Sequence, residues 1–137
     1  GNVLMITKAN ADESNTKYAQ GGIAAVMYAH DSYNKHIADT LDCGDGLCDK
    51  EVVEMVVRES TVRVQELAAW GAQFDKNPDG GYDLAKEGGH SEHRILHHKD
   101  ITGYEIERAA RPILPAMVHI FLIPNQEKQK LCWRVLR

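Results

Sequence analysis

One stretch decides the fold of this chain: Thr16-Lys17-Tyr18-Ala19-Gln20-Gly21-Gly22-Ile23-Ala24-Ala25. Its adjacent glycines, Gly21 and Gly22, follow a polar run and precede small residues. Glycine has no Cβ, so the backbone there can approach a flat ligand closely and adopt dihedral angles that other residues avoid. A Gly-Gly pair alone also suits a simple turn. The pair by itself therefore leaves a turn and a ligand-contacting loop both open.

The composition predicts one globular domain. A length of 137 residues is enough for one core but not for two domains. Hydrophobic residues make up 43% and charged residues 26%, as is average for a soluble protein. The net charge of -4 argues against nucleic acid as the main partner. No stretch approaches the ~20 apolar residues of a membrane helix, so no membrane is expected.

The cysteines predict a reducing compartment. Cys43, Cys48 and Cys132 are odd in number and lack Cys-x-x-Cys spacing. This pattern disfavours a disulfide framework and favours the cytoplasm.

The charge distribution predicts a boundary near residue 110. Residues 111–137 carry a net charge of +4, whereas residues 1–110 carry -8. Three of the four prolines also lie in the later segment. We expect residues 1–110 to form part of a domain, and residues 111–137 to be an atypical tail, altered or foreign.

Hydrophobic patterns predict helices and strands along the chain. Residues 3–7 are a short apolar run typical of a buried parallel strand. Residues 33–41 predict a short helix, and Asp49 predicts the N-cap of a longer one. The valines at 52, 53, 56 and 57 predict a core-facing stripe that continues past Ser60, a second cap candidate, until Gly71 ends the helix.

The second half of the chain predicts a turn, a strand and a helix. Residues 77–81 read as a turn between two short strands, and residues 93–98 as a strand. Thr102 and Glu105 match a capping box, which predicts a helix through about Ala110. Residues 118–121 are a further strand candidate.

The opening stretch resembles the flavin-contacting segment of the L-aspartate oxidases and of the succinate dehydrogenase/fumarate reductase flavoproteins. The resemblance spans roughly residues 1–109 and includes Asp39-Thr40-Leu41 and Gly46-Leu47-Cys48-Asp49. It implies an α/β fold, namely part of an FAD-binding Rossmann-like domain of the fumarate reductase flavoprotein type. The family's first strand and Gly-x-Gly-x-x-Gly phosphate loop would precede Val3 and are missing.

The resemblance also implies which residues contact FAD. The positions that fall on the family's flavin contacts are Lys8, Asn15, Thr16, Lys17, Tyr18, Ala19, Gln20, Gly21 and Gly22. Relatives with covalently attached flavin carry a histidine just before the threonine of this motif. Asn15 stands there in this chain and has no nucleophilic ring nitrogen, so we expect FAD to be bound non-covalently.

A second segment resembles the aspartate oxidase branch, and it runs Glu87-Gly88-Gly89-His90-Ser91 before Arg94-Ile95-Leu96-His97. In that branch the glutamate orients the substrate. This is chemically reasonable, because aspartate differs from succinate by an α-ammonium group that a carboxylate can pair with. The histidines at 90, 93, 97 and 98 also raise the alternative of a zinc site, but on a strand they would divide between the two faces. We therefore expect no metal.

The resemblance implies FAD-dependent oxidation of L-aspartate to iminosuccinate in de novo NAD biosynthesis, with dioxygen or fumarate as electron acceptor. The family's catalytic arginine would lie downstream, so we expect no catalytic residue in this chain and no activity from it alone. Two alternatives stay open: a soluble fumarate reductase or succinate-oxidising flavoprotein, and a non-enzymatic histidine-rich metal-binding fragment.

Overall fold

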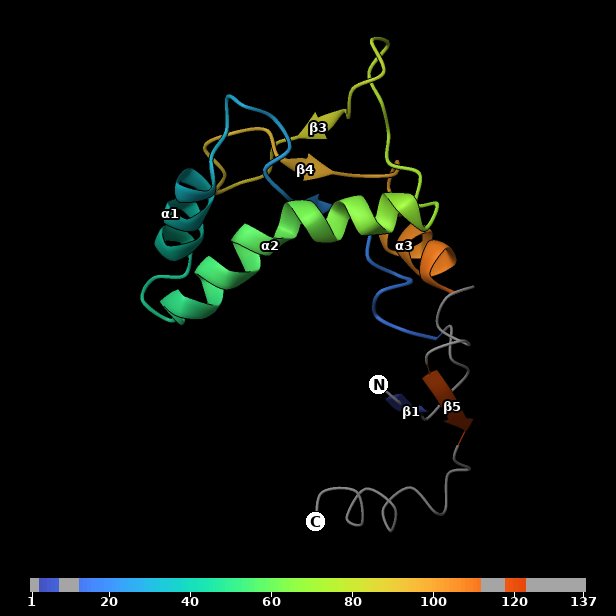
Figure 1. Cartoon of the computed structure of the whole chain (residues 1–137). Helices are drawn as coiled ribbons and strands as arrows, with labels where there is room; N and C mark the ends of the chain where they lie inside the picture. The colour runs from blue at the N-terminus through green and yellow to red at the C-terminus, as the bar shows by residue number, and fades with distance from the viewer. Residues whose placement is uncertain (1–2, 8–12, 112–117, 123–137) are drawn as a thin grey trace.

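The structure, a computed structural model, describes residues 3–7, 13–111 and 118–122, with side chains described only for 13–111. Its helices are α1, α2 and α3, and its strands are β1 to β5 (Figure 1). In chain order, they are β1 (Val3–Thr7), β2 (Ile23–Ala24), α1 (Tyr33–Cys43), α2 (Lys50–Ala69), β3 (Leu84–Ala85), β4 (Ile95–Leu96), α3 (Thr102–Ala110) and β5 (Val118–Leu122).

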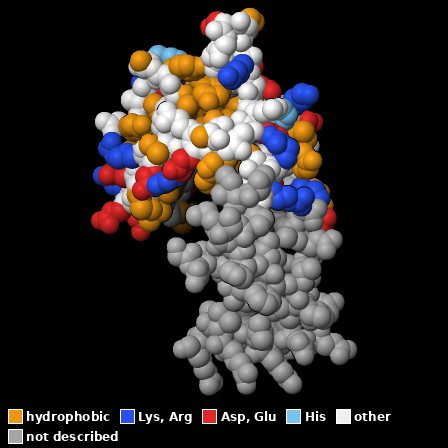
Figure 2. All heavy atoms as spheres, turned by 45° about the vertical axis from the view of Figure 1, so that its right-hand side comes forward, with side chains coloured by type: hydrophobic (Ala, Val, Ile, Leu, Met, Phe, Trp, Pro, Cys, Tyr) orange, Lys and Arg blue, Asp and Glu red, His pale blue; other side chains and the backbone are white. Residues whose placement is uncertain are grey.

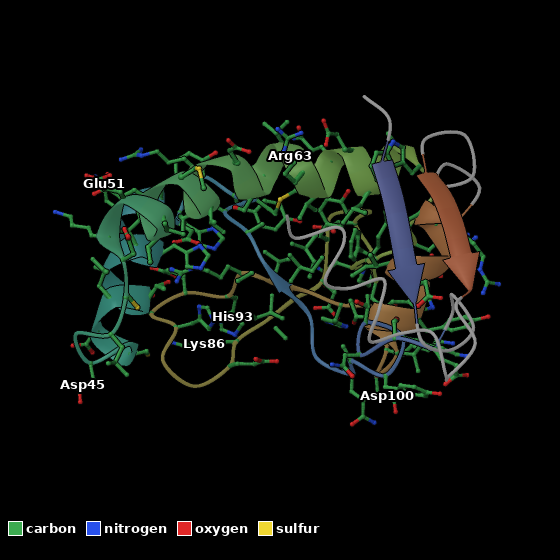
Figure 3. All side chains as sticks on the ribbon, turned by 90° about the horizontal axis from the view of Figure 1, so that it is seen from below. Asp45, Glu51, Arg63, Lys86, His93 and Asp100 are labelled. Atoms are coloured by element: carbon green, nitrogen blue, oxygen red, sulfur yellow. The ribbon has the colours of Figure 1, made fainter. Side chains whose placement is uncertain are left out.

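The strands form two separate sheets. β1 and β5 lie side by side and run in the same direction (Figure 3), with Val3 opposite Val118 and Thr7 opposite Leu122. The other sheet has the order β2-β4-β3, and β4 is antiparallel to both neighbours. The strands predicted at 3–7 and 118–121 are therefore confirmed, while the strand predicted over 93–98 is shorter.

α2 begins where the sequence predicts. The Asp49 carboxylate accepts hydrogen bonds from the N–H groups of Glu51 (3.0 Å) and Val52 (3.2 Å), which otherwise lack helical partners. The helix ends before Gly71, whose φ of +96° lies in the left-handed region. The second cap expected at Ser60 is wrong. Its hydroxyl donates to the Val57 carbonyl inside the helix.

The capping box expected at the start of α3 is also wrong. The Glu105 carboxylate does not turn back to the helix start but accepts from the Gln73 N–H (2.7 Å) and pairs with Arg108. Thr102 accepts from the His98 N–H (2.9 Å). Both side chains are buried and bind backbone N–H groups outside the helix, which would otherwise lack a partner: Thr102 binds that of the loop just before α3, and Glu105 binds that of residue 73 across the fold.

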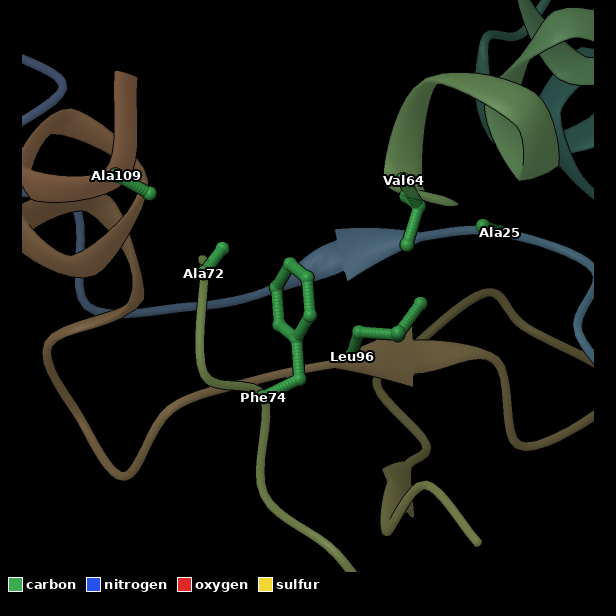
Figure 4. Close-up of a cluster of buried hydrophobic side chains, with 6 residues drawn as sticks. All are labelled: Ala25, Val64, Ala72, Phe74, Leu96 and Ala109. Atoms are coloured by element: carbon green, nitrogen blue, oxygen red, sulfur yellow. The ribbon is translucent and has the colours of Figure 1, made fainter. Parts of the chain in front are cut away.

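A small hydrophobic core joins α2, α3 and the antiparallel sheet (Figure 4). Val64 of α2 faces Leu96 of β4, with Phe74 beside them. The buried cluster consists of Ala25, Val64, Ala72, Phe74, Leu96 and Ala109. These side chains come from segments far apart in sequence, so the core forms only when the helices close over the sheet.

The predicted valine stripe is only half buried. Val57 and Val64 are 4% and 1% exposed and lie seven residues apart on one helix face. Val52 and Val56 are 50% and 56% exposed, which corrects the expectation that they belong to the core. The four valines of the predicted stripe, at 52, 53, 56 and 57, spread over more of the helix circumference than the part of α2 that is buried. The exposed pair instead lines an apolar hollow of about 300 Å³ beside α1.

The visible face in Figure 2 has hydrophobic side chains gathered in one area, with charged side chains of both signs around it. Among the described helices, none is both long enough and apolar enough to cross a membrane.

Replacing Gly103 with alanine should destabilise the chain by about 1–3 kcal/mol, because the start of α3 approaches residues 16–19 too closely to leave room for a side chain. A Cβ there would overlap the Thr16 carbonyl oxygen and stand 2.9 Å from the Ala19 Cβ and carbonyl oxygen. This overlap outweighs the roughly 0.5–1 kcal/mol that alanine gains in helix propensity. The shift in the urea unfolding midpoint of the 137-residue chain measures the loss.

Gly88→Ala is the matched control, since a Cβ there has no heavy atom within 4 Å. Its free energy of unfolding should stay within about 0.5 kcal/mol of that of the original chain. Equal midpoints for the two variants would contradict the close contact.

Candidate functional site

The motif loop, residues 14–22, is held against the start of α3. The Ser14 hydroxyl donates to Glu107 (2.9 Å), and the Gly103 N–H donates to the Ala19 carbonyl (2.9 Å). Within the loop, the Ala19 N–H donates to the Thr16 carbonyl (3.1 Å), which makes a turn. The loop therefore has a defined shape although most of its side chains are exposed.

The polar side chains of this loop suit a bound cofactor. Asn15, Thr16 and Gln20 are exposed, and their side chains make no hydrogen bond with the residues that the structure describes. A fixed backbone with uncommitted amide and hydroxyl groups fits a ligand rich in polar atoms, such as FAD. Lys8, the remaining flavin contact expected from the sequence, lies outside the described residues.

The two motif glycines have different surroundings. A Cβ on Gly22 would collide with the Leu96 carbonyl oxygen and the Ile95 side chain, so only glycine lets the loop enter β2 alongside β4. A Cβ on Gly21 would stand 3.6 Å from Glu87 Oε1. The structure thus brings together the two segments singled out from the sequence, which are 66 positions apart by number.

Glu87 lies on the hairpin loop, residues 86–94, which joins β3 to β4. The Glu87 carbonyl accepts from the His90 N–H (3.3 Å), closing a turn in which Gly89 has a φ of +85°. The Lys86 ammonium donates to the Ser91 carbonyl (2.9 Å) and ties the two sides of this turn together. The Glu87 side chain itself is exposed and faces the motif loop.

A buried ion network lies beneath this turn. Arg94 is 0% exposed, and its Nε and Nη2 donate to the two carboxylate oxygens of Asp31 (2.7 and 2.8 Å). Its Nη1 donates to Asp39 Oδ2 (2.5 Å), and the same oxygen accepts from both the N–H and the hydroxyl of Ser91 (2.8 Å each). A buried guanidinium needs this compensation, because transfer of a charge out of water costs several kcal/mol.

The network lowers the pKa values of its acids. Burial alone would raise the pKa of Asp39, but hydrogen bonds from Ser91 and Arg94 outweigh it and lower the pKa to about 2. The pKa of Asp31 is lowered in the same way by Arg94 and by the Ser32 N–H. Burial and the positive charge of Arg94 lower the pKa of His36. The carboxylates are therefore ionised and His36 is neutral near pH 7.

Sequence reasoning missed this network. It assigns no role to Arg94, although this residue stands directly before the apolar pair that forms the buried strand β4. A charged residue next to a buried strand is a usable signal, because it must find a partner. Nothing in the sequence identifies Asp31 and Asp39 as the partners, since they lie on a separate segment.

The four histidines are not gathered into one site. His93 is exposed, His90 Nδ1 lies 3.2 Å from Arg94, and the Nδ1 atoms of His97 and His98 lie 3.2 and 3.6 Å from the Asp75 carboxylate. Among the residues that the structure describes, no group of three or more histidine, cysteine or acidic side chains could hold a metal ion. The geometry therefore offers no support for a zinc site.

Comparisons with known proteins identify the family of this chain. The family model described as "FAD binding domain" matches residues 1–121. An L-aspartate oxidase of Nicotiana tabacum is 54% identical over 109 residues, which cover 80% of this chain and 17% of that protein. The L-aspartate oxidase of Yersinia pestis is 47% identical over 109 residues, covering 77% of this chain and 20% of that protein.

Solved structures give the same picture. A quinol fumarate reductase of E. coli superposes with a TM-score of 0.83 at 29% identity, covering 88% of this chain and 21% of that one. A flavocytochrome c3 fumarate reductase superposes with a TM-score of 0.74 at 27% identity, over 88% of this chain and 22% of that one. The fold is thus that of the fumarate reductase type of flavoprotein.

The chain belongs to the FAD binding domain family, and its cofactor class is FAD. It is similar to L-aspartate oxidases over most of its length, but it spans only about a fifth of theirs.

The ion network should make the chain sensitive to acid. A carboxylate whose pKa is lowered on folding stabilises the fold above its unfolded pKa, and this stabilisation is lost as pH falls through the folded value. For Asp39 the window runs from 3.8 down to about 2, and the loss should be about 2 kcal/mol. Urea unfolding should be measured for Asp39→Asn and for the original chain between pH 5 and pH 2. Their free energies of unfolding should differ at pH 5 and converge as the pH falls.

Asp45→Asn is the control for this comparison. Asp45 is exposed, and asparagine tolerates its left-handed backbone (φ 46°). A difference between Asp39→Asn and the original that stays constant with pH would show that the Asp39 charge is not linked to stability.

Proposed function

We propose that this chain is part of an L-aspartate oxidase, which oxidises L-aspartate to iminosuccinate with FAD and so serves de novo NAD biosynthesis. The observation that supports this most strongly is the position of Glu87 beside Gly21 of the motif loop. Similarity to L-aspartate oxidases over most of the chain supports it further.

Glu87 would recognise what distinguishes aspartate from other four-carbon dicarboxylates. Its carboxylate is exposed and can accept a charge-assisted hydrogen bond from the α-ammonium group of the substrate. FAD, held by the motif loop, would supply the redox chemistry as a hydride acceptor. Glu87 therefore orients the substrate, and no catalytic residue is proposed within residues 1–137.

The motif loop would hold the flavin. We propose Lys8, Asn15, Thr16, Lys17, Tyr18, Ala19, Gln20, Gly21 and Gly22 as the cofactor contacts. Asn15 lacks a nucleophilic ring nitrogen, so attachment is non-covalent. Residues 1–137 contain no Gly-x-Gly-x-x-Gly sequence, and we propose that another segment supplies the first strand and the phosphate loop and that activity requires it.

The remaining partners and the location follow from the same proposal. The electron acceptor is dioxygen or fumarate, and the boundary near residue 110 stays a prediction. The cysteine pattern favours the cytoplasm, whereas the plant relatives are named as chloroplastic.

A succinate-oxidising or fumarate-reducing flavoprotein is the alternative. The solved structures named above as fumarate reductases favour it at the level of fold. Glu87 disfavours it, because succinate and fumarate have no ammonium group for that carboxylate to bind.

Glu87→Gln, made in the intact flavoprotein that contains this segment, should lower kcat/KM for L-aspartate by about 10- to 100-fold. The reason is that a hydrogen bond between charged groups contributes about 1.5–3 kcal/mol. Binding of succinate, followed by the change in flavin absorbance, should change less than about threefold. Anaerobic bleaching of the flavin by aspartate provides the rate.

Glu92→Gln is the control, since Glu92 lies on the same hairpin loop but pairs with Lys35 at the surface. If Glu87→Gln lowers kcat/KM for L-aspartate and the affinity for succinate by equal factors, Glu87 does not bind the ammonium group of the substrate.

Flavin attachment can be tested separately. Acid precipitation of the same flavoprotein should release the flavin into the supernatant, where its fluorescence is measured. Flavin that stays with the precipitated protein would contradict the non-covalent attachment inferred from Asn15.

A further inference from the structure

The face of α1 toward the hairpin loop carries three contacts at helical spacing. His36, Asp39 and Cys43 lie three and then four residues apart, so they share one side of the helix. The His36 ring is 5.7 Å from that of His90. A Cβ on Gly89 would collide with the Cys43 Sγ, so the turn after Glu87 lies directly on this face.

Asp39 is the strongest of these contacts. Both donors of Ser91 bind its Oδ2 at 2.8 Å, and Arg94 binds the same oxygen. Arg94 is fixed in turn by its two hydrogen bonds to Asp31. The side chains of Arg94 and Asp39 are 0% and 17% exposed, so water competes only weakly for the bond between them, whereas the bonds from Ser91 lie at the surface.

Only a short turn separates Ser91 from Glu87. The bond from His90 to the Glu87 carbonyl and the bond from Lys86 to the Ser91 carbonyl leave this turn little freedom. Displacement of Ser91 would therefore move the Glu87 carboxylate relative to Gly21, although Asp39 itself does not touch Glu87.

We propose that Asp39, held by Arg94, is a positioning residue that fixes Glu87 over the motif loop and thereby determines selectivity for substrates with an α-ammonium group. This inference rests on the proposed function. It assigns to α1 a part in substrate selection that goes beyond its contribution to folding.

The test compares Asp39→Asn, Ser91→Ala and Glu87→Gln in the intact flavoprotein. The Asp39→Asn variant would present an amide toward the donors of Ser91, and Ser91→Ala removes one donor while keeping the backbone N–H. Because misplacement by about 1 Å can reduce a rate a hundredfold, Asp39→Asn should lower kcat/KM for L-aspartate at least tenfold. Ser91→Ala should lower it by a smaller factor, and the succinate dissociation constant should change less than threefold in both variants.

A double variant shows whether Asp39 acts through Glu87. Adding Asp39→Asn to Glu87→Gln should cause little further loss, because residues that act through one interaction are not additive. The positioning role would be overturned if the reductions of kcat/KM in the two single variants multiply in the double variant. It would also be overturned if Asp39→Asn weakens the use of aspartate and the binding of succinate by equal factors. Glu92→Gln breaks the exposed ion pair between the same loop and α1 and should leave selectivity unchanged.

A second measurement uses the 137-residue chain itself and does not depend on catalysis. Backbone NMR order parameters of residues 87–91 should fall from about 0.85 to below about 0.6 in Asp39→Asn and change less in Ser91→Ala, while those of α2 stay unchanged. A loop that remains rigid in both variants would overturn the proposal.

The outcomes separate the two levels of inference. If Glu87→Gln does not affect aspartate selectively, the proposed function fails. If Glu87→Gln is selective but Asp39→Asn and Ser91→Ala are not, only the positioning role fails.

Discussion

The guanidinium of Arg94 has no contact with solvent, yet it carries a full charge. Two carboxylates compensate it, one from the loop before α1 and one from α1 itself. Removing one partner of such a buried pair typically costs about 3–5 kcal/mol, because the remaining charge stays without compensation. The arrangement of α1, β4 and the hairpin loop therefore depends on all three side chains being present together.

The motif loop depends on a different constraint, which is close approach of the backbone. Gly22 lies against the Leu96 carbonyl, and Gly103 lies against the carbonyls of Thr16 and Ala19. These glycines let the loop contact both β4 and α3 without intervening side chains. The loop keeps its shape while the side chains of Asn15, Thr16 and Gln20 stay exposed, and a loop that is already ordered can bind a ligand without a large ordering cost.

Much of the local structure could be predicted from the sequence. The N-cap at Asp49, the end of α2 at Gly71 and the existence of α1 and α3 follow from propensities that act within a few residues. The capping box at Thr102 and Glu105 was wrong, although its pattern was correct, because the Thr102 hydroxyl binds the N–H of His98 just before the helix and the Glu105 carboxylate binds the N–H of Gln73, 32 residues away. The valine stripe was right for Val57 but wrong for Val52 and Val56, because the width of the buried helix face depends on which segments pack against α2.

The sequence by itself determined where the helices lie, since these depend on residue types at fixed short spacing, and its resemblance to flavoproteins predicted a flavin-contacting motif and a substrate contact at Glu87. Only the tertiary structure decided that Glu87 lies beside Gly21 and that Asp31, Asp39 and Arg94 form one network. Such contacts join segments more than fifty residues apart, and no local preference encodes which segments meet. The physical reason is that a buried charge and a close backbone contact are satisfied by whichever partner the folded chain brings near, and the core around Val64 and Leu96 sets that geometry.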